Sequence, residues 1–220
     1  MRQLIYFLTL SFLFGCVDSK TTNNTQTSDI SAVKFPLRAK FKNLNQVDED
    51  TLIASVNQTD FVITPEGKLS WGQNLADTIH LKTDVFIEKA YLFKVSDTLF
   101  IFYTETDNDG ATSRLEKINL KTRKSIWQTE IYAFNLGIPY IIDNFAYVTT
   151  IGTVSKIDLG SGKYIFQIRD LYDNKKSSFN SFDSIIFKDS LAIFLSKNIN
   201  SKRFDSIIVN EKTGNITVRK

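Results

Sequence analysis

The chain has 220 residues, of which 42% are hydrophobic and 13% aromatic, and its 27 Lys and Arg nearly balance its 24 Asp and Glu. This composition predicts one folded domain with appendages and excludes a globally disordered chain. The small net charge argues against nucleic acid as a partner, because such proteins usually carry a strongly basic stripe. A single Cys excludes an intramolecular disulfide and a cysteine metal cluster, and a single His argues against a His-based metal site.

The first residues, MRQLIYFLTLSFLFGC, have the layout of a secretory signal. The apolar run Leu4–Phe14 is too short to span a bilayer comfortably. Leu13-Phe14-Gly15-Cys16 resembles the lipobox of bacterial lipoproteins. The resemblance implies that residues 1–15 are removed as a signal peptide and that the Cys16 sulfur carries a diacylglycerol, with fatty acids such as palmitate. An incidental cysteine in an ordinary signal peptide is the alternative.

The segment after the signal, residues 16–31, predicts a flexible tether. It is rich in Ser, Thr, Asn, Gln and Asp and has almost no large apolar side chain, so it cannot bury enough surface to offset its ordering entropy. By analogy with lipoproteins, Val17 after the modified cysteine favours the outer membrane. We therefore expect a lipid-anchored protein of the bacterial cell envelope, which faces either the periplasm or the cell surface.

From residue 32 to residue 220 the signals are almost all β. Hairpin patterns recur along the chain in Phe61–Trp71, Lys117–Trp127, Lys156–Phe166 and Ile207–Val218. An Asp before a polar residue and an apolar run lies upstream of each copy, at Asp50, Asp97, Asp143 and Asp189. A period of 46 or 47 residues is typical of propellers and other arrays of β-units.

Each period contains four expected strands, which in the third copy are Pro139–Ile142, Phe145–Ile151, Val154–Leu159 and Lys163–Ile168. The predicted fold is therefore all-β, a small β-propeller-like array of about four four-stranded antiparallel units. An open β-array without a pocket is the alternative. We expect Ala32–Lys42 to supply a strand that completes the last unit.

Two hairpin sequences carry a family resemblance. Leu-x-Thr-x-Lys-x-x-Trp in 120–127 and Asp-Leu-x-Ser-Gly-Lys-x-x-Phe in 158–166 resemble the repeat of quinoprotein-type (PQQ-like) and WD40-like propellers. Many such propellers bind no quinone and act as envelope scaffolds or binding proteins, so the resemblance implies no cofactor. The repeated Asp residues are expected at hairpin turns. Trp71, Trp127 and Phe166 are expected to pack between units.

The segment ETDNDGATSRLE, residues 105–116, has the pattern of a calcium loop. Glu105, Asp107, Asp109 and Glu116 supply hard oxygen ligands, and Gly110 permits a sharp turn. The segment resembles EF-hand loops and the calcium hairpins of some propellers. The alternative is a solvated hairpin tip between strands at Leu99–Thr104 and Arg114–Leu120.

The sequence contains no phosphate-binding loop, nucleophile elbow or metallohydrolase motif. We therefore expect no enzyme, but a protein-binding or scaffold module whose partner is another envelope protein met through the hairpin loops 106–112 and 198–203. An immunity or inhibitor lipoprotein that caps a toxin is one such module. The alternative function is binding of envelope glycan, or carboxylate-based hydrolysis of it, on the same scaffold.

Overall fold

The computed structural model describes residues 37–38, 40–42, 51–83, 85–171, 179, 181–197 and 203–219. Every described residue belongs to one compact unit, Ser31–Lys220. The expected signal peptide, Cys16 and the tether lie outside the described residues. No helix among the residues described is long and apolar enough to cross a membrane.

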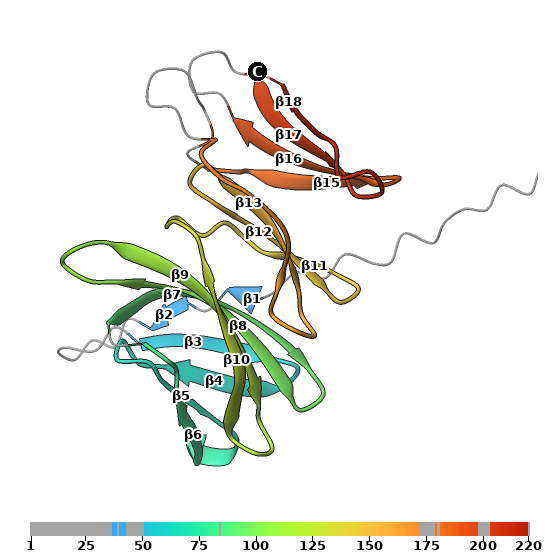
Figure 1. Cartoon of the computed structure of the whole chain (residues 1–220). Coiled ribbons are helices and arrows are strands. Elements are labelled where there is room, and N and C mark those ends of the chain that lie inside the picture. The colour runs from blue at the N-terminus through green and yellow to red at the C-terminus, as the bar shows by residue number, and fades with distance from the viewer. Residues whose placement is uncertain are drawn as a thin grey trace, which may run out of the picture. The chain divides into compact units, whose positions relative to one another are not determined.

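The described chain forms eighteen strands in four antiparallel sheets, so the all-β prediction is confirmed (Figure 1). Sheet 1 contains β2 (Lys40–Lys42), β3 (Thr51–Val56), β4 (Thr59–Ile63), β5 (Lys68–Trp71) and β6 (Asp77–His80). Sheet 2 contains β1 (Leu37–Arg38), β7 (Phe86–Val95), β8 (Thr98–Thr106), β9 (Ala111–Asn119) and β10 (Lys124–Ile131). Sheet 3 contains β11 (Tyr140–Ile142), β12 (Phe145–Thr150), β13 (Thr153–Asp158) and β14 (Tyr164–Ile168). Sheet 4 contains β15 (Ser184–Lys188), β16 (Leu191–Lys197), β17 (Phe204–Asn210) and β18 (Ile216–Arg219). A single 3₁₀ turn, η1 (Gln73–Leu75), precedes β6.

The expected four strands per period are present in every sheet, and β1 and β6 are additions to sheets 2 and 1. The N-terminal segment does not complete the last unit as expected. Leu37 and Arg38 pair with β7, whereas residues 40–42 pair with β3, so this short segment joins the first two sheets. The error arose because a short strand carries no sequence signal for the edge that it will join.

Three of the repeated corners are two-residue turns between the first and second strands of a unit, which confirms the turn prediction for them. A left-handed residue opens each turn, and these residues are Ser96, Asp143 and Asp189. Asp97 is therefore the second turn residue, so Ser96 and not Asp97 corresponds to Asp143. Asp50 lies outside the described residues.

The sheets pack face to face in chain order through three apolar clusters of buried residues. The first cluster joins sheets 1 and 2 and includes Phe61 and Ile101, and the second joins sheets 2 and 3 around Phe102 and Val148. The third joins sheets 3 and 4 around Phe194. Sheets 2 and 3 are therefore packed on both faces, which explains why the central strand β8 is almost continuously buried. Within the described ranges, no further cluster joins sheet 4 to sheet 1.

Aromatic residues on the fourth strands (β5, β10 and β14) contact the next sheet, as predicted. Trp71 is buried in the first cluster, and Trp127 and Phe166 pack against the second and third. The Trp127 indole N–H donates to the Gly160 carbonyl in the following sheet at 3.2 Å. A lysine that recurs in the repeat also contacts the following sheet. The Lys117 ammonium donates to the Leu159 carbonyl at 3.1 Å.

The equivalent lysine of sheet 3 is Lys156, which is 8% exposed. Its ammonium lies 3.0 Å from the Glu211 carboxylate of sheet 4 and 4.3 Å from the centre of the Phe145 ring. The Tyr147 hydroxyl donates to the same Glu211 oxygen at 2.5 Å. This buried charge is therefore neutralised and hydrogen-bonded by the next unit, which is the condition under which a buried ion pair is tolerated.

Candidate functional site

The strands of the β8–β9 hairpin are longer than those of the corresponding hairpins. Its strands have nine residues each, whereas the equivalent pairs β3–β4, β12–β13 and β16–β17 have between five and seven. Two extra residues lengthen a strand by about 7 Å. The extended tip is the loop at the left of Figure 1. The ends of β8 and β9 therefore carry residues that have no counterpart in the shorter hairpins of sheets 1 and 3.

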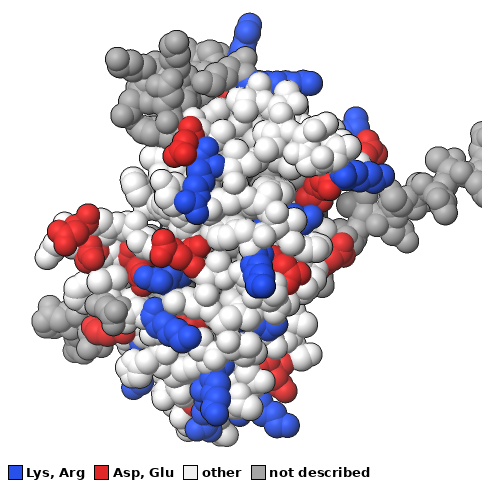
Figure 2. Space-filling view, viewed as in Figure 1, with Lys and Arg blue, Asp and Glu red and all other residues white. Residues whose placement is uncertain are grey.

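The tip of this hairpin is ordered by one carboxylate. The Asp107 Oδ1 atom accepts hydrogen bonds from the backbone N–H groups of Asp109 and Gly110, each at 2.8 Å. The Asp107 N–H in turn donates to the Gly110 carbonyl at 2.9 Å. Such a side-chain-to-backbone turn fixes a short loop without a ligand. In Figure 2, acidic side chains gather over this tip, whereas the rest of the visible face carries both signs.

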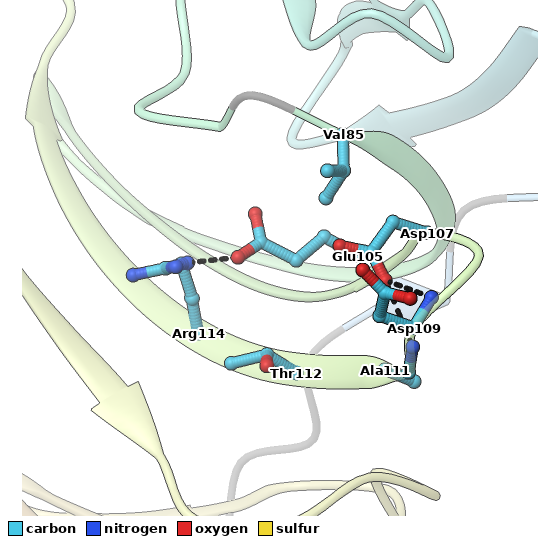
Figure 3. Close-up of a pocket in the computed structure, with 8 residues that line it drawn as sticks. Val85, Glu105, Asp107, Asp109, Ala111, Thr112 and Arg114 are labelled. Carbon is cyan, nitrogen blue, oxygen red and sulfur yellow. Dashed lines mark hydrogen bonds and ion pairs between the residues drawn. The ribbon is translucent and has the colours of Figure 1, made fainter.

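A hollow of about 570 Å³ lies at the base of the tip (Figure 3). Its lining residues are Val85, Glu105, Asp107, Asp109, Gly110, Ala111, Thr112 and Arg114. Glu105 is 4% exposed, and one of its carboxylate oxygens forms an ion pair with the Arg114 guanidinium. Its other oxygen, Oε2, is buried and has no hydrogen-bond partner among the described residues.

The cross-strand register brings Glu105 and Arg114 together. Arg114 is directly opposite Tyr103, so Glu105 is its diagonal neighbour on the same face of the sheet. Burial lowers the Arg114 pKa, but the hydrogen bond and the charge of Glu105 raise it by more, so the net pKa shift is upward. Arg114 therefore remains charged, and the hollow contains three carboxyl groups against one guanidinium.

Glu116 belongs to a different set of contacts. It is fully buried, and its Oε2 atom accepts hydrogen bonds from the Tyr103 hydroxyl at 3.2 Å and from the Lys82 N–H at 3.3 Å. The Gln128 amide donates to the Tyr103 hydroxyl at 2.7 Å and to the Lys82 carbonyl at 2.8 Å. Burial raises the Tyr103 pKa, and the Glu116 charge raises it further. This network fastens the segment that contains Lys82 to sheet 2.

The four predicted calcium ligands are thus divided. Glu105, Asp107 and Asp109 line the hollow, whereas Glu116 does not. Among the residues that the structure describes, no group of three or more His, Cys, Asp or Glu side chains is arranged to hold a metal ion. Binding of Ca²⁺ stays a prediction. The second loop expected to bind a partner, residues 198–203, lies outside the described residues except for Arg203.

Sequence reasoning missed Arg114 and Val85 as part of the site. The sequence predicts Arg114 only as part of a strand, because its contact with Glu105 depends on the register of β8 against β9. Val85 lies in a different segment, before β7, and only the tertiary structure brings it over the hollow. The extended, acidic hairpin itself was detectable from the alternating carboxylates in 105–109. A scan of protein-family models and a search of curated proteins find no match to this chain.

Proposed function

We propose that this protein is a lipid-anchored bacterial envelope protein that acts as a non-enzymatic protein-binding module. In this proposal the four sheets are the blades of a small propeller-like array, and the β8–β9 hairpin is the principal contact with the partner. The observation that carries the proposal is the hollow beneath the hairpin tip, where the buried Oε2 atom of Glu105 has no partner among the described residues.

The scaffold suits binding through a projecting loop. The sheet that carries the hairpin is packed on both faces, so the loop is supported by rigid strands, and the Asp107 turn holds its tip before any partner arrives. Loops that are positioned by a rigid framework are common recognition elements. Preorganisation also reduces the entropy that binding must overcome.

The test is affinity capture of the tagged, lipidated protein from crosslinked envelopes, followed by mass spectrometry. We expect one stoichiometric protein partner, and we expect the double substitution Asp107→Ala and Asp109→Ala to abolish its recovery. Glu66→Ala, at an exposed position in the β4–β5 hairpin, is the control and should leave recovery unchanged. A partner captured equally by the double variant would overturn the role of the hairpin. Absence of any enriched protein would overturn protein binding and favour the glycan or hydrolase alternative.

The lipid anchor is tested separately. Cys16→Ala removes the only sulfur that could carry the lipid, so we expect the variant to appear in the soluble fraction after cell lysis. Two or three acyl chains hold a protein almost permanently, because each buried methylene contributes about 0.8 kcal/mol. Retention of the variant in the membrane fraction would contradict the anchor.

A further inference from the structure

The hollow beneath the β8–β9 tip contains an acceptor that lacks a donor. The Glu105 side chain is almost completely buried, and its Oε1 atom is held by Arg114. Figure 3 shows Oε2 on the side of the carboxylate away from the Arg114 contact, toward Val85. Because a buried, unpaired carboxylate oxygen is costly, the site is improved by any ligand that supplies an N–H donor there.

The charge of the hollow selects the type of donor. Glu105, Asp107 and Asp109 line it together with one cation, Arg114. The Asp107 Oδ1 atom is already occupied by two backbone N–H groups, but its second oxygen receives no hydrogen bond from the described residues. A cationic donor would be attracted by the excess of carboxylates and would form charge-assisted hydrogen bonds with them.

The volume of the hollow and its lining residues further restrict the class of ligand that fits. A hollow of about 570 Å³ lies within the usual range for sites that take small groups. Val85 and Ala111 provide apolar surface beside the carboxylates. A long side chain with an aliphatic stem and a cationic end matches this combination, because such side chains bury their stems and keep their charge among polar groups.

We infer that the hollow receives a lysine or arginine side chain of the partner protein. On binding, the Glu105 carboxylate turns its Oε2 atom, which is closed off from solvent in the free protein, toward the cationic end and accepts a hydrogen bond from it. This inference rests on the proposed function and defines the chemistry of the partner's contact residue. The ordered tip, Asp107 to Gly110, contributes the second carboxylate at the entrance.

The test is an NMR titration of the isotope-labelled full chain in neutral detergent micelles. The probe is the capped tripeptide acetyl-Gly-Lys-Gly-amide, and the neutral control is the same peptide with an acetylated lysine. We expect the lysine peptide to shift the backbone amides of residues 105–114, and we expect the neutral peptide to shift none of them. The arginine analogue should behave like the lysine peptide.

Three variants locate the contact. Glu105→Gln should weaken binding by about tenfold, which corresponds to the loss of one charge-assisted hydrogen bond. Asp109→Asn, at an exposed position that leaves the fold unchanged, should weaken binding about two- to fivefold through lost Coulomb attraction. Asp60→Asn is the control, since this exposed carboxylate lies on β4 and does not line the hollow.

The inference is overturned if residues 105–114 do not respond, if the acetylated peptide binds equally well, or if neither site variant weakens binding. These results are separable from a failure of the proposed function. Peptide binding without a captured envelope protein would support the cation site and contradict the proposal of a protein partner. Capture of a partner that depends on the hairpin, combined with no peptide binding, would support the protein-binding module and contradict the cation site.

Discussion

At the scale of single residues, the repeat is defined by one backbone conformation in the hairpin between the third and fourth strands. Gly67, Gly162 and Gly214 occupy it with φ values between 72° and 83°. In sheet 2 the same position is held by Arg123, whose φ is 54° and whose guanidinium pairs with Asp77 of sheet 1. Sheet 2 therefore has a left-handed arginine where the other three sheets have glycine, and this arginine contacts the preceding sheet.

Gly162 and Gly214 provide a matched pair for substitution. A Cβ atom on Gly162 would lie 2.7 Å from the Trp127 ring, whereas a Cβ atom on Gly214 would meet nothing within 4 Å. We expect Gly214→Ala to reduce the free energy of unfolding by about 1 kcal/mol, the cost of a left-handed alanine. Gly162→Ala should cost at least about 2 kcal/mol, because overpacking adds to that strain. Urea unfolding of both variants measures the difference, and equal losses would show that the Trp127 contact is unimportant.

At the scale of the element, the central strands of sheet 2 are linked by a polar network rather than by apolar packing alone. Tyr103 on β8 donates to Glu116 on β9 and accepts from Gln128 on β10. Burial and the Glu116 charge raise the pKa of Tyr103. The folded protein therefore resists ionisation of this hydroxyl more than the unfolded chain does.

The sign of this effect predicts a loss of stability in alkali. A group whose folded pKa lies above its unfolded value of about 10 contributes full stability below pH 10 and loses it as the pH rises further. We expect the free energy of unfolding to fall less between pH 9 and pH 11 in Tyr103→Phe than in the wild-type protein. Tyr132→Phe, which alters a ring 38% exposed, should follow the wild type. Parallel curves for all three proteins would contradict the buried role of Tyr103.

The strands could be predicted from the sequence, but their partners could only partly be predicted. The four strands of the third unit are found within one residue of their expected bounds, because alternation and turn residues are local signals. Pairing of residues 37–42 with sheets 1 and 2, and of Glu105 with Arg114, depends on register and long-range contacts that no local pattern encodes. The site was therefore predicted as a run of carboxylates and found as an ion pair with one unpaired oxygen.

At the scale of the whole domain, the terminal sheet 4 differs from the central sheets 2 and 3 in the residues on the face that points away from the preceding sheet. The face of sheet 4 that turns away from sheet 3 carries Ile186, 47% exposed, and the half-buried Ile193 and Ile208. The equivalent positions in sheets 2 and 3 include the ordered lysines Lys117 and Lys156. Because Ile208 replaces that lysine, sheet 4 lacks the ammonium that reaches the following sheet in the two central units.

This difference predicts how sheet 4 responds to substitution. If no other sheet covers its outer face, Ile186→Lys should change the free energy of unfolding by less than about 1 kcal/mol, as for other surface positions. Phe194→Ala, in the packed face of the same sheet, should cost about 3–5 kcal/mol. Chemical denaturation compares the two variants directly. A similar loss for both would mean that another element closes over Ile186.

The central claim is that this domain binds a protein through the extended hairpin of sheet 2. The most direct measurement is photo-crosslinking in intact cells, with benzoylphenylalanine placed at the exposed Asn108 in the hairpin tip or at the exposed Lys121 in the β9–β10 hairpin. Binding through the β8–β9 tip predicts one discrete adduct from position 108 and none from position 121. No adduct at position 108, or the same adducts from both positions, would contradict it.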